Sequence, residues 1–162
     1  MRRYFVLIIV VLLTFSAGIF AKGQVVKDNK LLFLAAAPKA RLIHQQADHY
    51  LLMVRNAPGN IAYFTNRPAR KTGVLAVDKF VSLWTNANIK NNFTKNPPNV
   101  AVAMSMDNGL NQSFIAIMGK PLIKGKFIAY PLTKISKNKI HPGNSLNTIV
   151  FIDDVSWNPG GF

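Results

Sequence analysis

Cysteine and glutamate are both absent from this 162-residue chain, and each absence excludes a set of structures or functions. Without cysteine there is no disulfide scaffold, no cysteine-ligated zinc or iron–sulfur cluster and no thiol nucleophile. Without glutamate the chain lacks a favoured helix former, whereas its 16 asparagines favour turns, so the composition favours β-structure. Acidic residues are also scarce, because six aspartates face 20 lysines and arginines. The resulting net charge of +14 favours anionic partners.

The first 21 residues have the layout of a secretory signal peptide. Arg2 and Arg3 precede an uncharged apolar run from Tyr4 to Phe15, and small residues follow up to Ala21. The alternative is an uncleaved anchor, because the apolar run from Tyr4 to Ala21 has 18 residues and approaches the roughly 20 residues that span a bilayer. In both cases residues 22–162 are expected to form a single exported domain. Removal of Arg2 and Arg3 would leave 18 basic and 6 acidic residues, a net charge of +12.

The composition also indicates where an exported domain of this kind works. A hydrophobic fraction of 49% is sufficient for a packed core, so the domain does not depend on disulfides for stability. A cysteine-free exported domain is typical of a bacterial periplasmic or secreted protein. We therefore expect a periplasmic or secreted location, which makes nucleic acid an unlikely partner.

Short apolar segments separated by polar turns predict an α+β, mostly β domain with an antiparallel sheet of about seven strands. Both a sandwich-like arrangement and a curled sheet covered by one helix fit this pattern. The segments expected to be extended are 31–37, 41–45, 50–55, 61–65, 100–105, 113–118, 127–132 and 147–152. The first of them is either a strand or a packed arm.

Local signals predict two hairpins and one helix. The Pro58-Gly59 turn predicts that 50–55 and 61–65 pair as a hairpin, and Asp107-Asn108-Gly109 predicts a second hairpin between 100–105 and 113–118. The main helix is expected near 76–86. Its apolar stripe, at i, i+3, i+4 and i+7, consists of Val77, Phe80, Val81 and Trp84.

The segment Tyr63-Phe64-Thr65-Asn66-Arg67-Pro68-Ala69-Arg70 is the most distinctive in the chain. Pro68 predicts a corner at the end of a strand, which would bring Arg67 and Arg70 close together. Two guanidinium groups can clamp a carboxylate or phosphate. The alternative is that one arginine stacks on an aromatic ring while the other is solvated.

This segment also carries a resemblance. Together with Gly73, the Phe80/Trp84 pair, Phe93 and Pro97-Pro98-Asn99, it resembles an uncharacterised family of exported bacterial proteins. The similarity extends to the late strand that ends at Asp153-Asp154. It implies export, bacterial origin and a single domain, but no activity. Members often carry Asp where this chain has Asn66, so position 66 is not expected to be a required carboxylate. The residues expected to have structural roles are Tyr63, Phe64, Pro68, Phe80, Trp84 and Asp153.

The region from Lys120 to Lys139 is the strongest electrostatic feature of the sequence. It contains six lysines and no acidic residue, and Phe127 and Tyr130 lie among the lysines. For an exported protein, the expected anions are lipid, lipopolysaccharide, acidic glycan or an acidic protein. The alternative is a solvated face that only maintains solubility. The candidate binding residues are Arg67, Arg70, Lys120, Lys124, Lys126, Lys134, Lys137 and Lys139.

Evidence for catalysis is weak in this sequence. His44, Asp48 and His49 surround a turn, but their spacing alone does not bring them to one metal ion. Ser145, His141 and Asp153 form a triad only on paper, because the strained G-x-S-x-G turn is missing. Asp153 and Asp154 are expected to form a salt bridge with Arg67 or Arg70, or to cap a turn. No metal, cofactor or catalytic residue is therefore assigned.

The sequence supports three functional hypotheses. The first is an exported, non-catalytic binding domain that contacts an anionic envelope component, host surface or protein partner. The second is a structural or accessory envelope protein without a ligand. The third is a hydrolase with an unrecognised site. Contact with a membrane is expected only through the signal segment or an uncleaved anchor.

Overall fold

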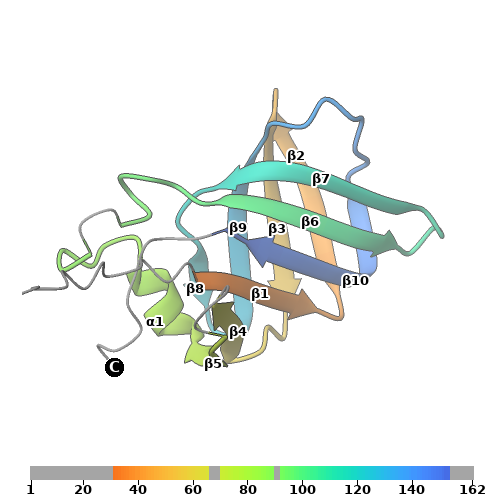
Figure 1. Cartoon of the computed structure of the whole chain (residues 1–162). Helices are drawn as coiled ribbons and strands as arrows, with labels where there is room; N and C mark the ends of the chain where they lie inside the picture. The colour runs from red at the N-terminus through yellow and green to blue at the C-terminus, as the bar shows by residue number, and fades with distance from the viewer. Residues whose placement is uncertain (1–30, 66–69, 90–91, 154–162) are drawn as a thin grey trace, which may run out of the picture.

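Ten strands and one short helix make up the computed structural model, which describes residues 31–65, 70–89 and 92–153 (Figure 1). The N-terminal segment 1–21, expected to be a signal peptide or anchor, lies outside the described residues. In chain order the elements are β1 (Leu31–Ala37), β2 (Ala40–Gln46), β3 (His49–Arg55), β4 (Asn60–Thr65), β5 (Thr72–Ala76), α1 (Val77–Ser82), β6 (Asn99–Met106), β7 (Asn111–Met118), β8 (Leu122–Lys124), β9 (Phe127–Lys134) and β10 (Gly143–Ile152).

The predicted class, a mostly β domain with an antiparallel sheet and one helix, is confirmed. Six strands follow one another in the order β2-β3-β9-β7-β6-β10, and β10 pairs back onto β2, which closes the sheet into a ring. Of the two arrangements considered, the fold is therefore the curled sheet. The strands number ten rather than about seven, in part because the short strands β5 and β8 carry no clear sequence signal.

A bend at Pro38 and Lys39 divides one extended segment between the ring and an extension of the sheet. Before the bend, β1 pairs with the C-terminal part of β10, and after it β2 pairs with the N-terminal part of the same strand. The far edge of β1 then carries β4, and β5 pairs with β4. Strand β8 pairs with β9 outside this path.

One of the two predicted hairpins is wrong. The segment 50–55 lies in β3, whose neighbours are β2 and β9, whereas 61–65 lies in β4, whose neighbours are β1 and β5. The turn around Pro58 and Gly59 therefore leads the chain from the ring to the extension. The other hairpin is confirmed, because β6 pairs with β7 and Gly109 adopts a positive φ of 85° in the turn.

The interior of the ring is filled by side chains from the strands that form it. Burial alternates strictly along β6, so that Val100, Val102, Met104 and Met106 point inward. A cavity of about 20 Å³ remains beside residues that include Val54, Ile128 and Tyr130. A space of that size holds about one water molecule, and the buried side chains of the described strands pack together in one core cluster.

An aromatic cluster packs beneath α1. Phe80 and Trp84 make edge-on contacts with Phe93, and Phe33 of β1 contacts Phe80 with ring centroids 5.2 Å apart. The α-helix is shorter than expected and ends at Ser82, but the chain continues in turns and Trp84 still reaches the core. The predicted burial of the stripe is confirmed for Val77, Phe80 and Trp84.

Candidate functional site

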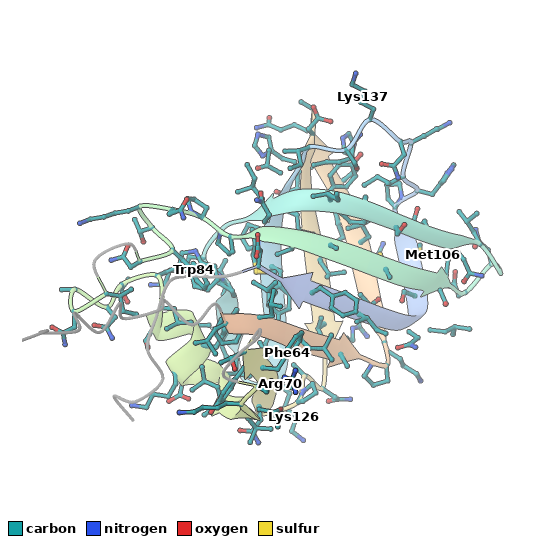
Figure 2. The ribbon with its side chains drawn as sticks, in the orientation of Figure 1. Phe64, Arg70, Trp84, Met106, Lys126 and Lys137 are labelled. Carbon is teal, nitrogen blue, oxygen red and sulfur yellow. The ribbon has the colours of Figure 1, made fainter. Side chains whose placement is uncertain are left out.

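The Lys120–Lys139 region is divided by β9 between two ends of the molecule. Lys124 and Lys126 lie in and beside the turn that precedes β9, whereas Lys137 and Lys139 follow β9 at its other end. Figure 2 shows Lys126 and Lys137 at opposite ends of the structure. The eight residues of β9 alone span roughly 26 Å at the usual rise of a strand. The six lysines therefore do not form one site.

Lys134 has a structural role in the described chain. Its Nζ donates to the backbone oxygens of Ser136 and Asn138, at 2.8 and 3.1 Å, and lies 3.8 Å from an Asp48 carboxylate oxygen. These contacts hold the loop after β9 against the turn between β2 and β3. Lys134 is therefore removed from the set of candidate binding residues, whereas Lys120, Lys137 and Lys139 are exposed.

The pairing of strands gives Lys124 and Lys126 new cationic neighbours that are distant in sequence. Lys124 pairs with Phe127, which in turn pairs with Arg55 of β3. Arg41 of β2 pairs with Met53, two residues from Arg55 on the same outward side of β3. We call this surface the basic face. It consists of the exposed cations Lys39, Arg41, Arg55, Lys124 and Lys126.

Two hollows on the basic face meet at Met53. One, of about 780 Å³, is lined by Lys124, Lys126, Leu122 and Phe127. The other, of about 450 Å³, is lined by Lys39, Arg41 and Arg55. Asp107 is the one acidic residue among the described residues that line either hollow. The basic face thus combines a positive field with exposed apolar side chains.

Sequence reasoning identified only Lys124 and Lys126 of the basic face. The signal for Arg41 and Arg55 was present, because both occupy outward positions of strands whose alternate residues are buried. Their neighbours could not be predicted, since the ring places β3 beside β9 rather than beside β4.

Arg70, the described member of the predicted arginine clamp, is not part of the basic face. Arg67 and Pro68 lie outside the described residues, as does Asp154. Arg70 is exposed, has a φ of 49°, and precedes Lys71, whose backbone is joined to Thr65 by paired hydrogen bonds. Lys71 therefore lies at the Thr65 end of β4, whereas the Lys126 carbonyl accepts a hydrogen bond from Ala57, before the other end of β4. Arg70 is therefore separated from Lys126 by the length of β4.

Asp153 and Arg70 lie at the same end of the sheet. The amide of Asp153 donates to the carbonyl of Asn99 at 2.8 Å. The end of β10 pairs with β1, which pairs with the Thr65 end of β4. A salt bridge from Asp153 to Arg67 or Arg70 stays a prediction.

Two other expected structural residues, Tyr63 and Phe64, lie on opposite faces of β4. Tyr63 is half-buried and packs on Phe33, and its ring covers Gly73 so closely that a Cβ there would lie 2.6 Å from the hydroxyl. Phe64 points outward and is exposed. Tyr63 therefore fixes the β4–β5 pair to the aromatic cluster, and Phe64 contributes to the outer surface.

The opposite side of the ring carries no charge on its strands. The outward positions of β7, β6, β10, β1, β4 and β5 hold only apolar and small polar side chains in the described chain. One cross-strand row shows this clearly, because it runs Ile115, Ala101, Phe151, Leu34, Ala62 and Val74. We call this surface the uncharged face.

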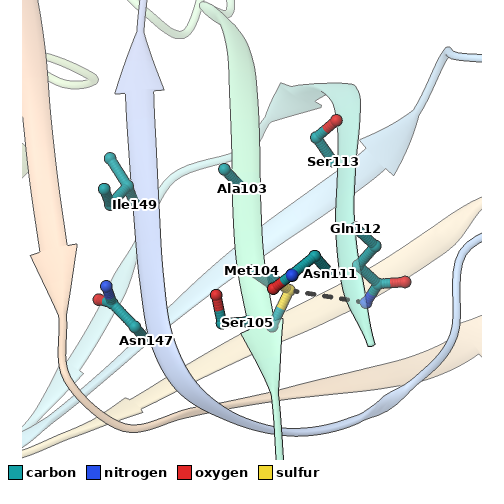
Figure 3. Close-up of a pocket in the computed structure, with 8 residues that line it drawn as sticks. All are labelled: Ala103, Met104, Ser105, Asn111, Gln112, Ser113, Asn147 and Ile149. Carbon is teal, nitrogen blue, oxygen red and sulfur yellow. Dashed lines mark hydrogen bonds between the residues drawn. The ribbon is translucent and has the colours of Figure 1, made fainter. Parts of the chain in front are cut away.

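A hollow of about 380 Å³ lies at one end of the uncharged face (Figure 3). Its side chains come from β10, β6 and β7, and none of them is titratable. Gln112 is engaged elsewhere, because its amide donates to the backbone oxygen of His141 and its carbonyl accepts from the amide of His141. This hollow therefore lacks a candidate general acid or base.

Neither the histidines nor the hypothetical triad of Ser145, His141 and Asp153 converges on a catalytic or metal site. His44 contacts the backbone oxygen of Ala47 at 2.8 Å, and His49 contacts the hydroxyl of Thr133 at 3.2 Å. Ser145 is buried, and its hydroxyl is hydrogen-bonded to the backbone oxygen of Asn147 and to the hydroxyl of Thr148. Asp153 lies beyond the opposite end of β10, roughly 26 Å from Ser145 along an extended strand. No group of three potential metal ligands occurs among the described residues.

Two buried aromatic residues carry polar atoms in the interior. Burial raises the pKa of Tyr130 to about 12, because the phenolate would be poorly solvated there. The indole Nε1 of Trp84 is buried and has no hydrogen-bond partner among the described residues. Both lie within the core, away from the basic face.

Comparisons with protein-family models, with curated proteins and with solved structures give no match for this chain. The resemblance to a family of exported bacterial proteins therefore stays a prediction. In the part of the chain that is described, no helix has the length and apolar character needed to cross a membrane.

Proposed function

We propose that the protein is an exported, non-catalytic binding domain that contacts an anionic partner through its basic face. The observation that carries this proposal is the gathering of five exposed cations, from the bend before β2, from β2 and β3, and from the β8–β9 hairpin, around two adjoining hollows. These cations come from three separate parts of the sequence. They lie on one outward side of the sheet, where their positive charges add and favour an anionic partner.

The filled ring supports a surface contact rather than enclosure of a ligand. Proteins that carry small molecules inside a closed sheet need an internal cavity, whereas the cavity found here holds about one water molecule. An anionic partner would instead bind on the outside, where lysine and arginine contact phosphate or carboxylate groups. An envelope component is the partner class that fits the proposed export.

A matched pair of charge reversals tests this proposal. Lys124→Glu with Lys126→Glu should sharply weaken binding of the purified chain to immobilised heparin, used as a generic polyanion. Lys137→Glu with Lys139→Glu makes the same change in net charge at the other end of β9 and should have a much smaller effect. Binding is measured over a salt series, because screening should weaken the contact.

Equal losses from the two pairs would contradict the proposal, since binding would then depend on net charge alone. Circular dichroism and thermal unfolding of each variant establish that the fold is retained. All four lysines are exposed, so their replacement should leave the core intact.

A further inference from the structure

The β8–β9 hairpin presents apolar side chains to solvent beside its lysines. Leu122 is 63% exposed and Phe127 is 44% exposed, although both are large hydrophobic residues. The pairing of Leu122 with Ala129 and of Lys124 with Phe127 places these side chains on one outward surface. Scattered exposed apolar residues are common, but here they line the same hollow as two lysines.

The turn of this hairpin fixes the position of the two lysines. Gly125, with a φ of 58°, and Lys126 connect β8 directly to β9 in a two-residue turn. Glycine is favoured at the first position of such a turn because a side chain there would be strained. The Lys126 carbonyl also accepts a hydrogen bond from the Ala57 amide at 3.2 Å, which anchors the tip to the loop after β3.

This combination fits an amphiphilic anion better than a fully hydrated one. A soluble acidic glycan would satisfy the lysines but would offer little to Leu122 or Phe127. An anionic bilayer offers both, because its phosphates lie at the level of the lysine ammonium groups and its acyl boundary lies a few ångströms deeper. Arg55, which flanks Phe127 on the neighbouring strand, adds a further cation that can donate hydrogen bonds to a lipid phosphate.

Resting on the proposed function, we infer that the β8–β9 hairpin docks the protein onto an anionic bilayer surface. Leu122 and Phe127 enter the interface, and Lys124 and Lys126 contact lipid phosphates. This contact differs from the expectation that a membrane is reached only through the N-terminal segment.

The experiment measures partitioning onto vesicles of mixed phosphatidylglycerol and phosphatidylcholine, with pure phosphatidylcholine vesicles as the neutral reference. Lys124→Gln with Lys126→Gln should weaken partitioning roughly 25-fold, from about fivefold for each basic residue at the surface. Leu122→Ser with Phe127→Ser should weaken it by about tenfold or more, because apolar area no longer leaves water. Heparin binding by the serine variant should be unchanged.

Matched controls come from the other surfaces. Ile115→Ser with Ile117→Ser removes two exposed apolar side chains from the uncharged face and should leave partitioning unchanged. Phe127→Trp supplies a second readout that does not depend on loss of binding. The fluorescence of the added indole should shift to shorter wavelength on anionic vesicles and stay unshifted on neutral ones.

Each outcome separates the two proposals. If the serine variant of the hairpin partitions normally and the emission of the Phe127→Trp variant does not shift, the bilayer inference is overturned while the basic face still binds anions. Loss of partitioning by the Ile115 and Ile117 control, with none by the hairpin variant, would also overturn it. If Lys124→Gln with Lys126→Gln weakens neither vesicle nor heparin binding, the proposed function itself fails.

Discussion

The basic face and the uncharged face are built on one continuous sheet, yet they differ in almost every outward residue. The basic face presents lysine and arginine from β2, β3 and the β8–β9 hairpin. The uncharged face presents alanine, leucine, isoleucine, valine and phenylalanine from strands that include β6, β10 and β1. The inward residues of both sets of strands are similar and fill the same core.

This difference shows that the two sides of a strand have separate roles, one in core packing and the other in surface chemistry. Alternate residues point inward and are constrained by packing, whereas the residues between them are free to set the chemistry of the surface. In a chain with a net charge of +14, an even distribution of lysine and arginine would place some of them on every strand, so the strands without outward charge form a distinct surface. The distribution of charge by strand, rather than the total charge, distinguishes the two faces.

The largest expected effect is on the stability of the core that the two faces share. Trp84 is 3% exposed and packs on Phe80 and Phe93 beneath α1. Trp84→Ala should lower the free energy of unfolding by about 3–5 kcal/mol in urea denaturation, because a large cavity remains. Vesicle partitioning below the melting temperature should not change. A loss close to zero would mean that the aromatic cluster does not stabilise the ring and its extension.

Much of this architecture was predictable from local patterns. The alternation in 100–105 and 113–118 lies within the observed β6 and β7, and Asp107-Asn108-Gly109 forms the turn between them. The stripe through Phe80 and Trp84 is buried as predicted, even though the α-helix ends at Ser82. These features depend on neighbours within a few residues, which is the information that periodicity contains.

The remaining errors concern contacts between distant segments. The turn at Pro58 and Gly59 predicts a hairpin, but β3 already has partners on both edges, so the chain crosses to β1 instead. Strand β5 contains a glycine and leads directly into α1, and β8 has only three residues, so neither gives a clear period. The basic face is missed for the same reason, because Arg41 and Arg55 join Lys124 only through ring closure.

A smaller effect on stability is expected from Tyr130, which lies in the core beneath the basic face. Because burial raises the pKa of Tyr130 to about 12, the unfolded chain loses this proton near pH 10 while the folded chain retains it. Stability from this group is therefore fully present below pH 10 and is lost between pH 10 and 12. The loss reaches about 2–3 kcal/mol for a two-unit difference in pKa.

Tyr130→Phe isolates this contribution. Any other pH-dependent contribution is common to the variant and the parent chain, so the difference between the two proteins reports Tyr130 alone. The free energy of unfolding, measured by urea denaturation at pH 7, 10 and 11, should fall less steeply with pH in the variant. Parallel pH dependence in the two proteins would contradict the assigned burial of the tyrosine hydroxyl.

The smallest expected effect bears directly on the comparison of the two faces. Ala101 lies on β6, between Phe151 and Ile115, on the side of the ring opposite β3. Ala101→Lys adds a charge to the uncharged face, yet it should change vesicle partitioning by less than about twofold, since screening limits a charge beyond a Debye length of about 8 Å. The free energy of unfolding should change by no more than about 0.5 kcal/mol, because Ala101 is exposed. A several-fold change in partitioning, in either direction, would show that the uncharged face also meets the bilayer, and the division of roles between the two faces would then be wrong.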